Sequence, residues 1–404
     1  MKTEKNIFLK KVISVAVIMT VLYSGFAKGG NLNPPAGPDE GTMLDLDQVE
    51  PRISIPGSET PTGPFVISES GSYYLTGNRH ASGNAINVEA DNVSIDLMGY
   101  ALVGPGKASG DNHGIYMFSR QNIQICNGTV TQFGAEGIYE ASNDWGKNHK
   151  VLNVRVISNG DDGICLRNQG HTIKYCTAIG NGGRGIFAYN DSILAGNISY
   201  DNDESGVYAN DGCIVKKNVT FKNEFGINAA EGSNVLRNIV WDCNNTGLIV
   251  YSNCLVKENT VCENTYGIRV RTTSGLLQSS SVVTANTACH NEYTGILVSE
   301  GPGTHVERNT VANNNTADVG GYAGIHTGED CRILENVLRR NDYAQIYVTG
   351  SDNCIEHNLF TDGEYGLLFT ANYNFYSQNR ASGNSSGDYV NTLNQTDGQG
   401  NSSF

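Results

Sequence analysis

Ionisable side chains directly precede four Gly-hydrophobic pairs that follow one another in the first half of this 404-residue chain. They are His113, Glu136, Asp162 and Arg184, and Asp161 adds a carboxylate beside the third of them. Hydrolysis of a glycosidic bond uses two carboxyl groups about 5 to 9 Å apart, one as the acid and the other as the nucleophile or base. A neighbouring arginine favours the ionised carboxylates. These residue types therefore permit acid–base chemistry on a sugar, provided that the fold brings them together.

The element that must position these residues is a repeat of mostly 20 to 23 residues. A glycine followed by an aliphatic residue returns from Gly114-Ile115 to Gly366-Leu367, and Ala85-Ile86 is the opening copy. Short alternating apolar runs and Asn- and Gly-bearing turns fill each repeat, whereas helical periodicity is absent. The pattern predicts an all-β parallel β-helix of about 12 to 13 coils, stacked ~4.8 Å apart. That spacing would place the four charged residues in one column along the rod.

Aromatic and arginine side chains recur two and four positions after the repeated glycines, where we expect one outward strand face. Sugar rings stack on aromatic rings, and arginine holds carboxylates. The alternative is aromatic stacking that only stiffens the rod. The candidate substrate-binding residues on this face are Tyr116, Tyr139, Arg167, Phe187, Tyr189 and Tyr208.

Asparagine and cysteine also keep fixed places in the repeat. Stacked amides can hydrogen-bond along a rod, and two ladders are predicted: Asn197, Asn218, Asn238, Asn259, Asn286, Asn309, Asn336 and Asn358, and Asn181, Asn202, Asn223, Asn244, Asn264, Asn291 and Asn341. Cys262 and Cys289 occupy matching positions in consecutive repeats, within disulfide reach. Most of the other cysteines are expected to be buried thiols.

These repeats resemble the right-handed parallel β-helix proteins of the pectin-lyase-like superfamily, which includes pectate lyases, polygalacturonases, alginate epimerases and periplasmic copper-maturation proteins. Polygalacturonase-like glycosidases carry Asp before Gly-Ile, then G-D-D, then G-H-G, and later R-I-K. Here A-E-G-I at Glu136, G-D-D-G-I at Asp161 and Asp162, and G-R-G-I at Arg184 follow that order, with Glu for Asp and Arg for His. A local match to the last motif, G-I-R-V-R-T at 267–272, lies about four coils beyond Arg184. The resemblance implies a right-handed β-helix with a partial and degenerate polygalacturonase-like motif.

The ends of the chain differ in composition from the repeats. Residues 1–27 read as a secretory signal peptide, 28–64 as a Pro-rich linker, 65–383 as the β-helix domain and 384–404 as a polar tail. Export would place the protein in the periplasm or outside the cell, with no membrane contact after signal cleavage. The net charge of −14 argues against a nucleic acid partner.

The sequence thus predicts an exported, monomeric β-helix protein that binds or modifies a polysaccharide, uronate-containing polymers included, as a hydrolase or lyase. Whether it is an enzyme is left open. The catalytic candidates are His113, Glu136, Asp161, Asp162 and Arg184. The alternatives are a non-catalytic surface or matrix rod and a periplasmic copper-maturation protein, although Met and His clusters are missing. No cofactor is expected, with calcium on the acidic residues the one option kept.

Overall fold

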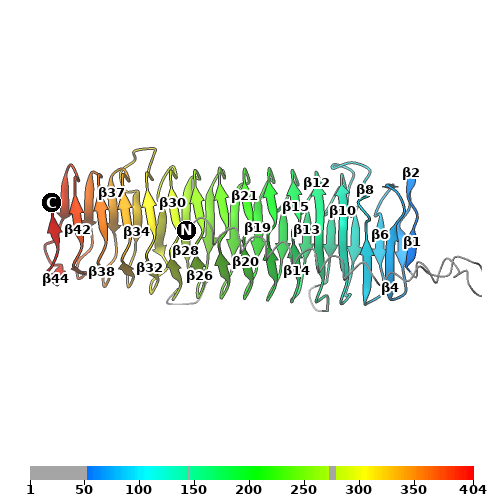
Figure 1. Cartoon of the computed structure of the whole chain (residues 1–404), viewed down its shortest axis with the longest axis horizontal. Helices are drawn as coiled ribbons and strands as arrows, with labels where there is room; N and C mark the ends of the chain where they lie inside the picture. The colour runs from blue at the N-terminus through cyan, green and yellow to red at the C-terminus, as the bar shows by residue number, and fades with distance from the viewer. Residues whose placement is uncertain (1–51, 143–144, 273–278) are drawn as a thin grey trace, which may run out of the picture. The chain divides into compact units, whose positions relative to one another are not determined.

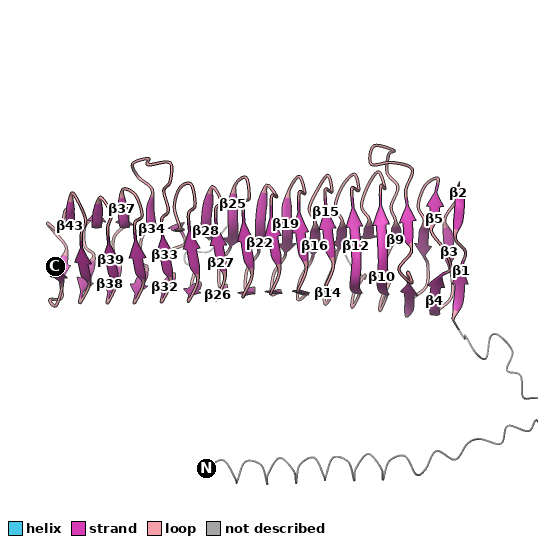
Figure 2. Cartoon of the chain, turned by 45° about the horizontal axis from the view of Figure 1, so that its top comes forward, coloured by secondary structure: helices cyan, strands magenta, loops and turns pink. Residues whose placement is uncertain are grey.

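The computed structural model describes residues 52–142, 145–272 and 279–404, which form an all-β parallel solenoid (Figures 1 and 2). The predicted signal peptide and most of the predicted linker lie outside these residues. None of the described residues belongs to a helix long and apolar enough to cross a membrane. The unit that begins at Arg52 is described by itself below.

The Gly-Ile face, named after the repeated dipeptide, is a 15-stranded parallel sheet whose successive strands come from successive coils. Its strands are β3 (Phe65–Ile67), β6 (Ile86–Val88), β9 (Ile115–Met117), β11 (Ile138–Glu140), β13 (Ile164–Leu166), β16 (Ile186–Ala188), β19 (Ser205–Ala209), β22 (Phe225–Ala229), β25 (Thr246–Val250), β28 (Tyr266–Arg271), β31 (Ile296–Glu300), β34 (Ala323–Thr327), β37 (Ala344–Val348), β40 (Tyr365–Phe369) and β43 (Gly387–Val390).

The other strands form a 30-stranded assembly that covers two further faces of the rod. The second face consists of β1 (Ile53–Ile55), β4 (Gly71–Leu75), β7 (Val93–Asp96), β10 (Gln124–Thr131), β12 (Lys150–Ile157), β14 (Thr172–Lys174), β17 (Ile193–Ala195), β20 (Ile214–Lys216), β23 (Asn234–Leu236), β26 (Leu255–Lys257), β29 (Val282–Thr284), β32 (His305–Glu307), β35 (Arg332–Leu334), β38 (Cys354–Glu356), β41 (Phe375–Ser377) and β44 (Thr396–Asp397).

The third face shares the long strands β10 and β12 with the second, because these two strands run through the corner between the faces. Its other strands are β2 (Ser58–Thr62), β5 (Arg79–Ala81), β8 (Ala101–Val103), β15 (Thr177–Ile179), β18 (Ile198–Tyr200), β21 (Val219–Phe221), β24 (Ile239–Trp241), β27 (Thr260–Cys262), β30 (Thr287–Cys289), β33 (Thr310–Ala312), β36 (Val337–Arg339), β39 (Leu359–Thr361), β42 (Arg380–Ser382) and β45 (Ser402–Ser403).

The solenoid has about 16 turns, so the predicted 12 to 13 coils were too few. Every predicted anchor lies at one of the strands β6 to β40. The count was too low because β3, which lies inside the predicted β-helix domain, and β43 lack the Gly-Ile pair. Strands β1 and β2 fall within the predicted linker, and β43 to β45 within the predicted tail. A terminal strand has only one neighbour, so it tolerates Pro61 in β2 and a polar composition in the tail.

The core consists mainly of aliphatic side chains that point inward from most strands and stack from coil to coil. On the Gly-Ile face Ile115, Ile138, Ile164 and Ile186 follow one another in register, and each is fully buried. The residue between two inward side chains points outward, as in Tyr116 and Tyr139. Alternation thus fixes which residues of each repeat reach the solvent.

Two asparagine ladders run through the solenoid, close to the prediction. The first is confirmed: Asn238, for example, accepts hydrogen bonds from the backbone N and Nδ2 of Asn218 and donates to Asn259. The second differs at one position, since Cys243 replaces Asn244, and it also includes Asn159 and Asn314. The backbone N of Asn244 donates instead to the backbone carbonyl oxygen of Asn223, and the side chain of Asn244 is exposed.

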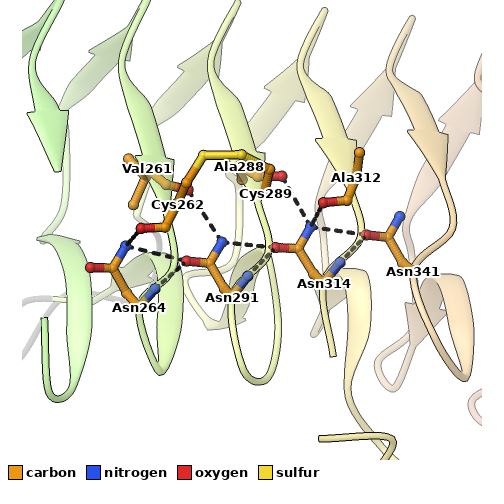
Figure 3. Close-up of a disulfide and its surroundings, with 9 residues drawn as sticks. All are labelled: Val261, Cys262, Asn264, Ala288, Cys289, Asn291, Ala312, Asn314 and Asn341. Carbon is orange, nitrogen blue, oxygen red and sulfur yellow. Dashed lines mark hydrogen bonds between the residues drawn. A yellow bond between two sulfur atoms is a disulfide. The ribbon is translucent and has the colours of Figure 1, made fainter. Parts of the chain in front are cut away.

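The predicted disulfide between Cys262 and Cys289 is present and joins β27 to β30, with a Cα–Cα distance of 4.6 Å (Figure 3). It lies beside the second asparagine ladder, where Asn264, Asn291, Asn314 and Asn341 follow one another. Of the eight free cysteines, six are buried, as predicted for most of them.

Candidate functional site

The four ionisable residues predicted to share a column do so at the corner that leads into the Gly-Ile face. Backbone hydrogen bonds of 2.9–3.3 Å join the amide of each following glycine to the carbonyl of the next charged residue, from Gly114 through Gly137 to Gly163. Consecutive members therefore come from neighbouring coils. The two pairs that result, His113 with Glu136 and Asp162 with Arg184, differ in geometry.

The first pair is formed by His113 and Glu136. Nδ1 of His113 lies 3.0 Å from Oε2 of Glu136, and their side chains are only 12% and 10% exposed. The imidazole stacks on Tyr116, with ring centroids 5.2 Å apart, and lies 4.9 Å from the ring of Tyr139. Glu136 thus already has a basic partner in a small aromatic cluster.

The second pair is a two-pronged ion pair. Nε and Nη2 of Arg184 donate to Oδ1 and Oδ2 of Asp162 at 3.1 and 2.8 Å, and the backbone N of Arg184 donates to Oδ1 at 2.7 Å. The Asp162 side chain is 3% exposed. Burial raises the pKa of Asp162 to about 6, while the hydrogen bonds and charge of Arg184 act in the opposite direction. Asp162 is therefore a buried anchor for Arg184.

Asp161 differs from its neighbour because it is exposed. Desolvation on its inner side, followed by the charge of Glu136, raises its pKa. Of the three predicted carboxylates, Asp161 alone is open to solvent. The column thus offers one accessible acidic group and two that contact basic side chains.

The predicted aromatic row lies in register on the Gly-Ile face. Tyr116, Tyr139, Cys165, Phe187 and Tyr208 are direct neighbours on β9, β11, β13, β16 and β19. The ring of Phe187 is 5.3 Å from that of Tyr208 and 6.1 Å from that of Tyr189, measured between centroids. The sequence therefore placed these side chains correctly, while their role stays a prediction.

The arginines contact this aromatic row. The guanidinium carbon of Arg184 lies 4.0 Å from the ring centroid of Phe187 and 5.4 Å from that of Tyr208. The corresponding carbon of Arg167 lies 5.5 Å from the ring centroid of Tyr139. Such distances allow cation–π attraction.

A pocket of about 480 Å³ opens between the two arginines. Tyr189 is 41% exposed at its edge, whereas Phe187 is only 7% exposed and supports Arg184 from below. The pocket is lined by Arg167, Asn168, Arg184, Phe187 and Tyr189. It unites five side chains from two neighbouring coils, four of which the sequence predicted.

Beneath this pocket lies a buried ladder that sequence reasoning missed. His149 Nδ1 accepts from the backbone N of Ile123, and His171 Nδ1 accepts from the backbone N of His149, both at 3.3 Å. Ser192 and Cys213 continue the ladder in the next coils. The two histidines do not show as members of this ladder in the sequence, because insertions change their spacing from the repeated glycine. His149 lies twelve residues after Gly137 and His171 eight after Gly163, whereas Cys213 lies seven after Gly206.

The ladder supports the pocket directly. Nε2 of His171 donates to the carbonyl oxygen of Arg167 at 2.7 Å and so closes the turn that carries Arg167 and Asn168. Nε2 of His149 lies 3.3 Å from Oε2 of the fully buried Glu140. Burial lowers the pKa of His171 to about 3, and the nearby His149 adds to this effect. His171 is therefore neutral at ordinary pH.

No group of three or more His, Cys, Asp or Glu side chains in the described ranges is arranged to hold a metal ion. Asp162 points its carboxylate to Arg184 and Glu136 faces His113, so calcium is not part of the function proposed below. The arginines of the 267–272 segment lie on β28, four coils beyond β16, as predicted. They do not reach this pocket.

The fold defines a parallel β-helix protein, and the family comparison agrees. The sequence model of the right-handed β-helix region matches residues 80–240 and 234–402, so the chain belongs to the right-handed β-helix family. No curated protein matches the chain significantly.

Several solved structures are similar to this chain at low sequence identity. The A-module of a mannuronan C-5 epimerase of Azotobacter vinelandii is 12% identical, with a TM-score of 0.43 and coverage of 83% of this chain and 91% of the other. DFA-IIIase of Arthrobacter chlorophenolicus A6 without its lid is 12% identical, with a TM-score of 0.42 over 82% and 88%. An α-1,3-glucanase catalytic unit of Streptomyces thermodiastaticus is 13% identical, with a TM-score of 0.41 over 88% and 64%. The likeness concerns the fold alone.

Proposed function

We propose that this protein binds a polysaccharide on its Gly-Ile face, and that it prefers polymers that contain uronate. The observation that carries the proposal is the arginine–aromatic site: Arg167, Arg184, Phe187, Tyr189 and Tyr208. A sugar ring presents an apolar face that can stack on an exposed aromatic ring, and its carboxylate can be held by a guanidinium group.

The two arginines suit this role because their positions are fixed before a ligand arrives. Arg184 is held by Asp162 on one side and by Phe187 on the other. Arg167 lies against Tyr139, and its backbone carbonyl is held by His171. Side chains that are already ordered lose less conformational freedom on binding, which favours affinity.

Modification of the bound polymer is the further step to be tested. Asp161 is the exposed carboxylate of the column, and burial of part of the side chain and the charge of Glu136 raise its pKa, which is the direction that a proton donor needs. Glu136 is the neighbouring carboxylate one coil away, with His113 as its partner. Any hydrolytic activity of this site would therefore depend on Asp161 and Glu136 more than on Asp162.

A polysaccharide partner also fits an exported protein. The Cys262–Cys289 disulfide is of the kind that persists in oxidising compartments. In this proposal the protein acts in the periplasm or outside the cell.

The test is a panel of uronate and neutral polysaccharides, assayed by affinity electrophoresis, with parallel assays for reducing ends and unsaturated products. We expect Tyr189→Ala to weaken uronate binding about tenfold, which corresponds to ~1.4 kcal/mol. Tyr175→Ala is the matched control, since Tyr175 is 69% exposed at the corner between the second and third faces. Equal retention of the polymers by the wild type and both variants would favour the structural rod instead.

A further inference from the structure

Three tyrosines meet at the corner of the rod that leads into the Gly-Ile face, several coils beyond the arginine–aromatic site. Tyr293 and Tyr322 stack with ring centroids 4.5 Å apart, and Tyr266 lies 5.2 and 6.0 Å from them. The hydroxyl groups of Tyr266 and Tyr322 are 3.4 Å apart. All three side chains are half-buried. We call this group the tyrosine cluster.

The loop that carries Tyr322 is held in place by hydrogen bonds. It connects β33 to β34 and extends beyond the neighbouring turns (Figure 1). Asn315 donates from Nδ2 to the carbonyl oxygens of Val319 at 3.0 Å and Asp342 at 3.2 Å, and its Oδ1 accepts from the backbone N of Val319. The loop that carries Tyr322 is thus held in place before any ligand binds, and Tyr266 and Tyr293 come from the neighbouring coils.

Two arginines adjoin the tyrosine cluster on the Gly-Ile face. Arg269 and Arg271 lie on β28, the strand that begins with Tyr266, and their side chains are 23% and 35% exposed. Both contact the carboxylate of Glu300 on β31. Because Arg269 and Arg271 share the single carboxylate of Glu300, this arginine pair retains a positive charge, while Glu292 lies beside Tyr293 on the other side of the cluster.

These residues repeat the chemistry of the arginine–aromatic site on the same face. Four coil steps separate β16 from β28, which is ~19 Å at the spacing of parallel strands. The outward side chains between them carry no charge: Tyr208, Asn228 and Ile249 in one row, and Asn210, Ala230 and Tyr251 in the next. These two rows therefore form an uncharged track between the two arginine-bearing groups, with Glu204 and Glu224 along one side of it and Asp211 and Glu231 along the other.

We propose that the tyrosine cluster, Arg269 and Arg271 form a second binding site for an acidic glycan, so that one long polyuronate chain occupies both sites along the rod. This inference rests on the proposed function and extends it. Two linked sites bind one polymer far more tightly than either site alone, because the second contact becomes intramolecular. The face thus selects for polymer length as well as for charge.

The test counts binding sites by calorimetry with an oligouronate of three sugars, which is too short to span the track. We expect two sites per chain in the wild type and one in a Tyr293→Ala/Tyr322→Ala double variant, whereas Tyr189→Ala should keep two, one of them about tenfold weaker. The double variant Tyr293→Phe/Tyr322→Phe keeps the rings and should keep two sites. Tyr373→Ala, at a 75% exposed position, is the control and should also keep two. Melting temperatures show whether each variant is folded.

A long polyuronate provides the second measurement. The wild type should bind it at least ~100-fold more tightly than the trimer, and the alanine double variant should lose most of that difference. A single wild-type site that Tyr189→Ala weakens about tenfold would overturn this inference and leave the proposed function intact. The absence of any binding in the wild type would overturn both.

Discussion

Arg184 and Asp162 are joined by three hydrogen bonds, two from the guanidinium group and one from the backbone N of Arg184. This arrangement divides the two aspartates of the G-D-D-G segment between different roles. Asp162 is buried and holds the next coil, whereas Asp161 faces the solvent. A motif that looks like a catalytic pair in sequence is thus one structural and one accessible carboxylate.

The first prediction concerns the stability of this pair. Asp162→Asn should lower the free energy of unfolding by about 1.5–3 kcal/mol, because the substitution removes charged hydrogen bonds to a partly buried arginine. Asp161→Asn should change it by less than ~0.5 kcal/mol, since that side chain is exposed. Urea denaturation of both variants checks the difference. Equal losses of unfolding free energy in the two variants would contradict the assignment of Asp162 as the buried aspartate and Asp161 as the exposed one.

The second prediction concerns acid stability. The folded-state pKa of His171 is lowered to about 3, below the ordinary value of 6.5, so the folded protein binds fewer protons than the unfolded chain. The contribution of His171 to the free energy of unfolding is therefore complete above pH ~6.5 and is lost as the pH falls toward 3. Between pH 7 and pH 4 the wild type should lose about 3 kcal/mol that His171→Asn does not lose.

Asparagine is the suitable replacement because Asn353 and Asn374 fill the corresponding role in later coils, where they accept backbone hydrogen bonds. Contributions of other groups, such as His326 with a pKa lowered to about 4, are common to both proteins and cancel in the comparison. Parallel stability curves for the wild type and the variant would contradict the prediction.

The third prediction concerns the disulfide. It closes a loop between residues 27 positions apart, which the chain-entropy estimate values at about 3.5 kcal/mol. Thermal unfolding with and without a reductant should show this loss, and Cys262→Ser/Cys289→Ser should unfold like the reduced wild type. Cys213→Ser is the control, because Ser192 and Ser233 occupy the same ladder in adjacent coils. A reductant effect in the double serine variant would point to another thiol.

The fold could be predicted from the sequence because the Gly-Ile pair marks the same strand position in successive repeats. The Gly-Ile pairs located thirteen strands of the 15-stranded sheet, and the aromatic row on that sheet is in register as predicted. The outermost strands of this sheet could not be located in this way, because a terminal strand has only one neighbour and lacks the Gly-Ile pair. The ionisable column was predictable in position, yet its pairing was not, since the choice of Arg184 for Asp162 depends on side-chain geometry within the coils.

The second asparagine ladder also shows that the sequence spacing did not predict every side-chain contact, since it chose Asn244 where the structure has Cys243. The asparagine ladders give the fourth prediction. Asn259 accepts hydrogen bonds from the backbone N and Nδ2 of Asn238 and donates to Val235 and Asn286. Asn259→Ala should therefore lower the free energy of unfolding by about 3–5 kcal/mol, because buried partners lose their hydrogen bonds. Asn244→Ala should be nearly neutral, since Cys243 holds that place in the ladder and Asn244 is exposed. Chemical denaturation of both variants measures the contrast. A large loss for Asn244→Ala would restore the ladder that the sequence spacing predicted and contradict the one in the structure.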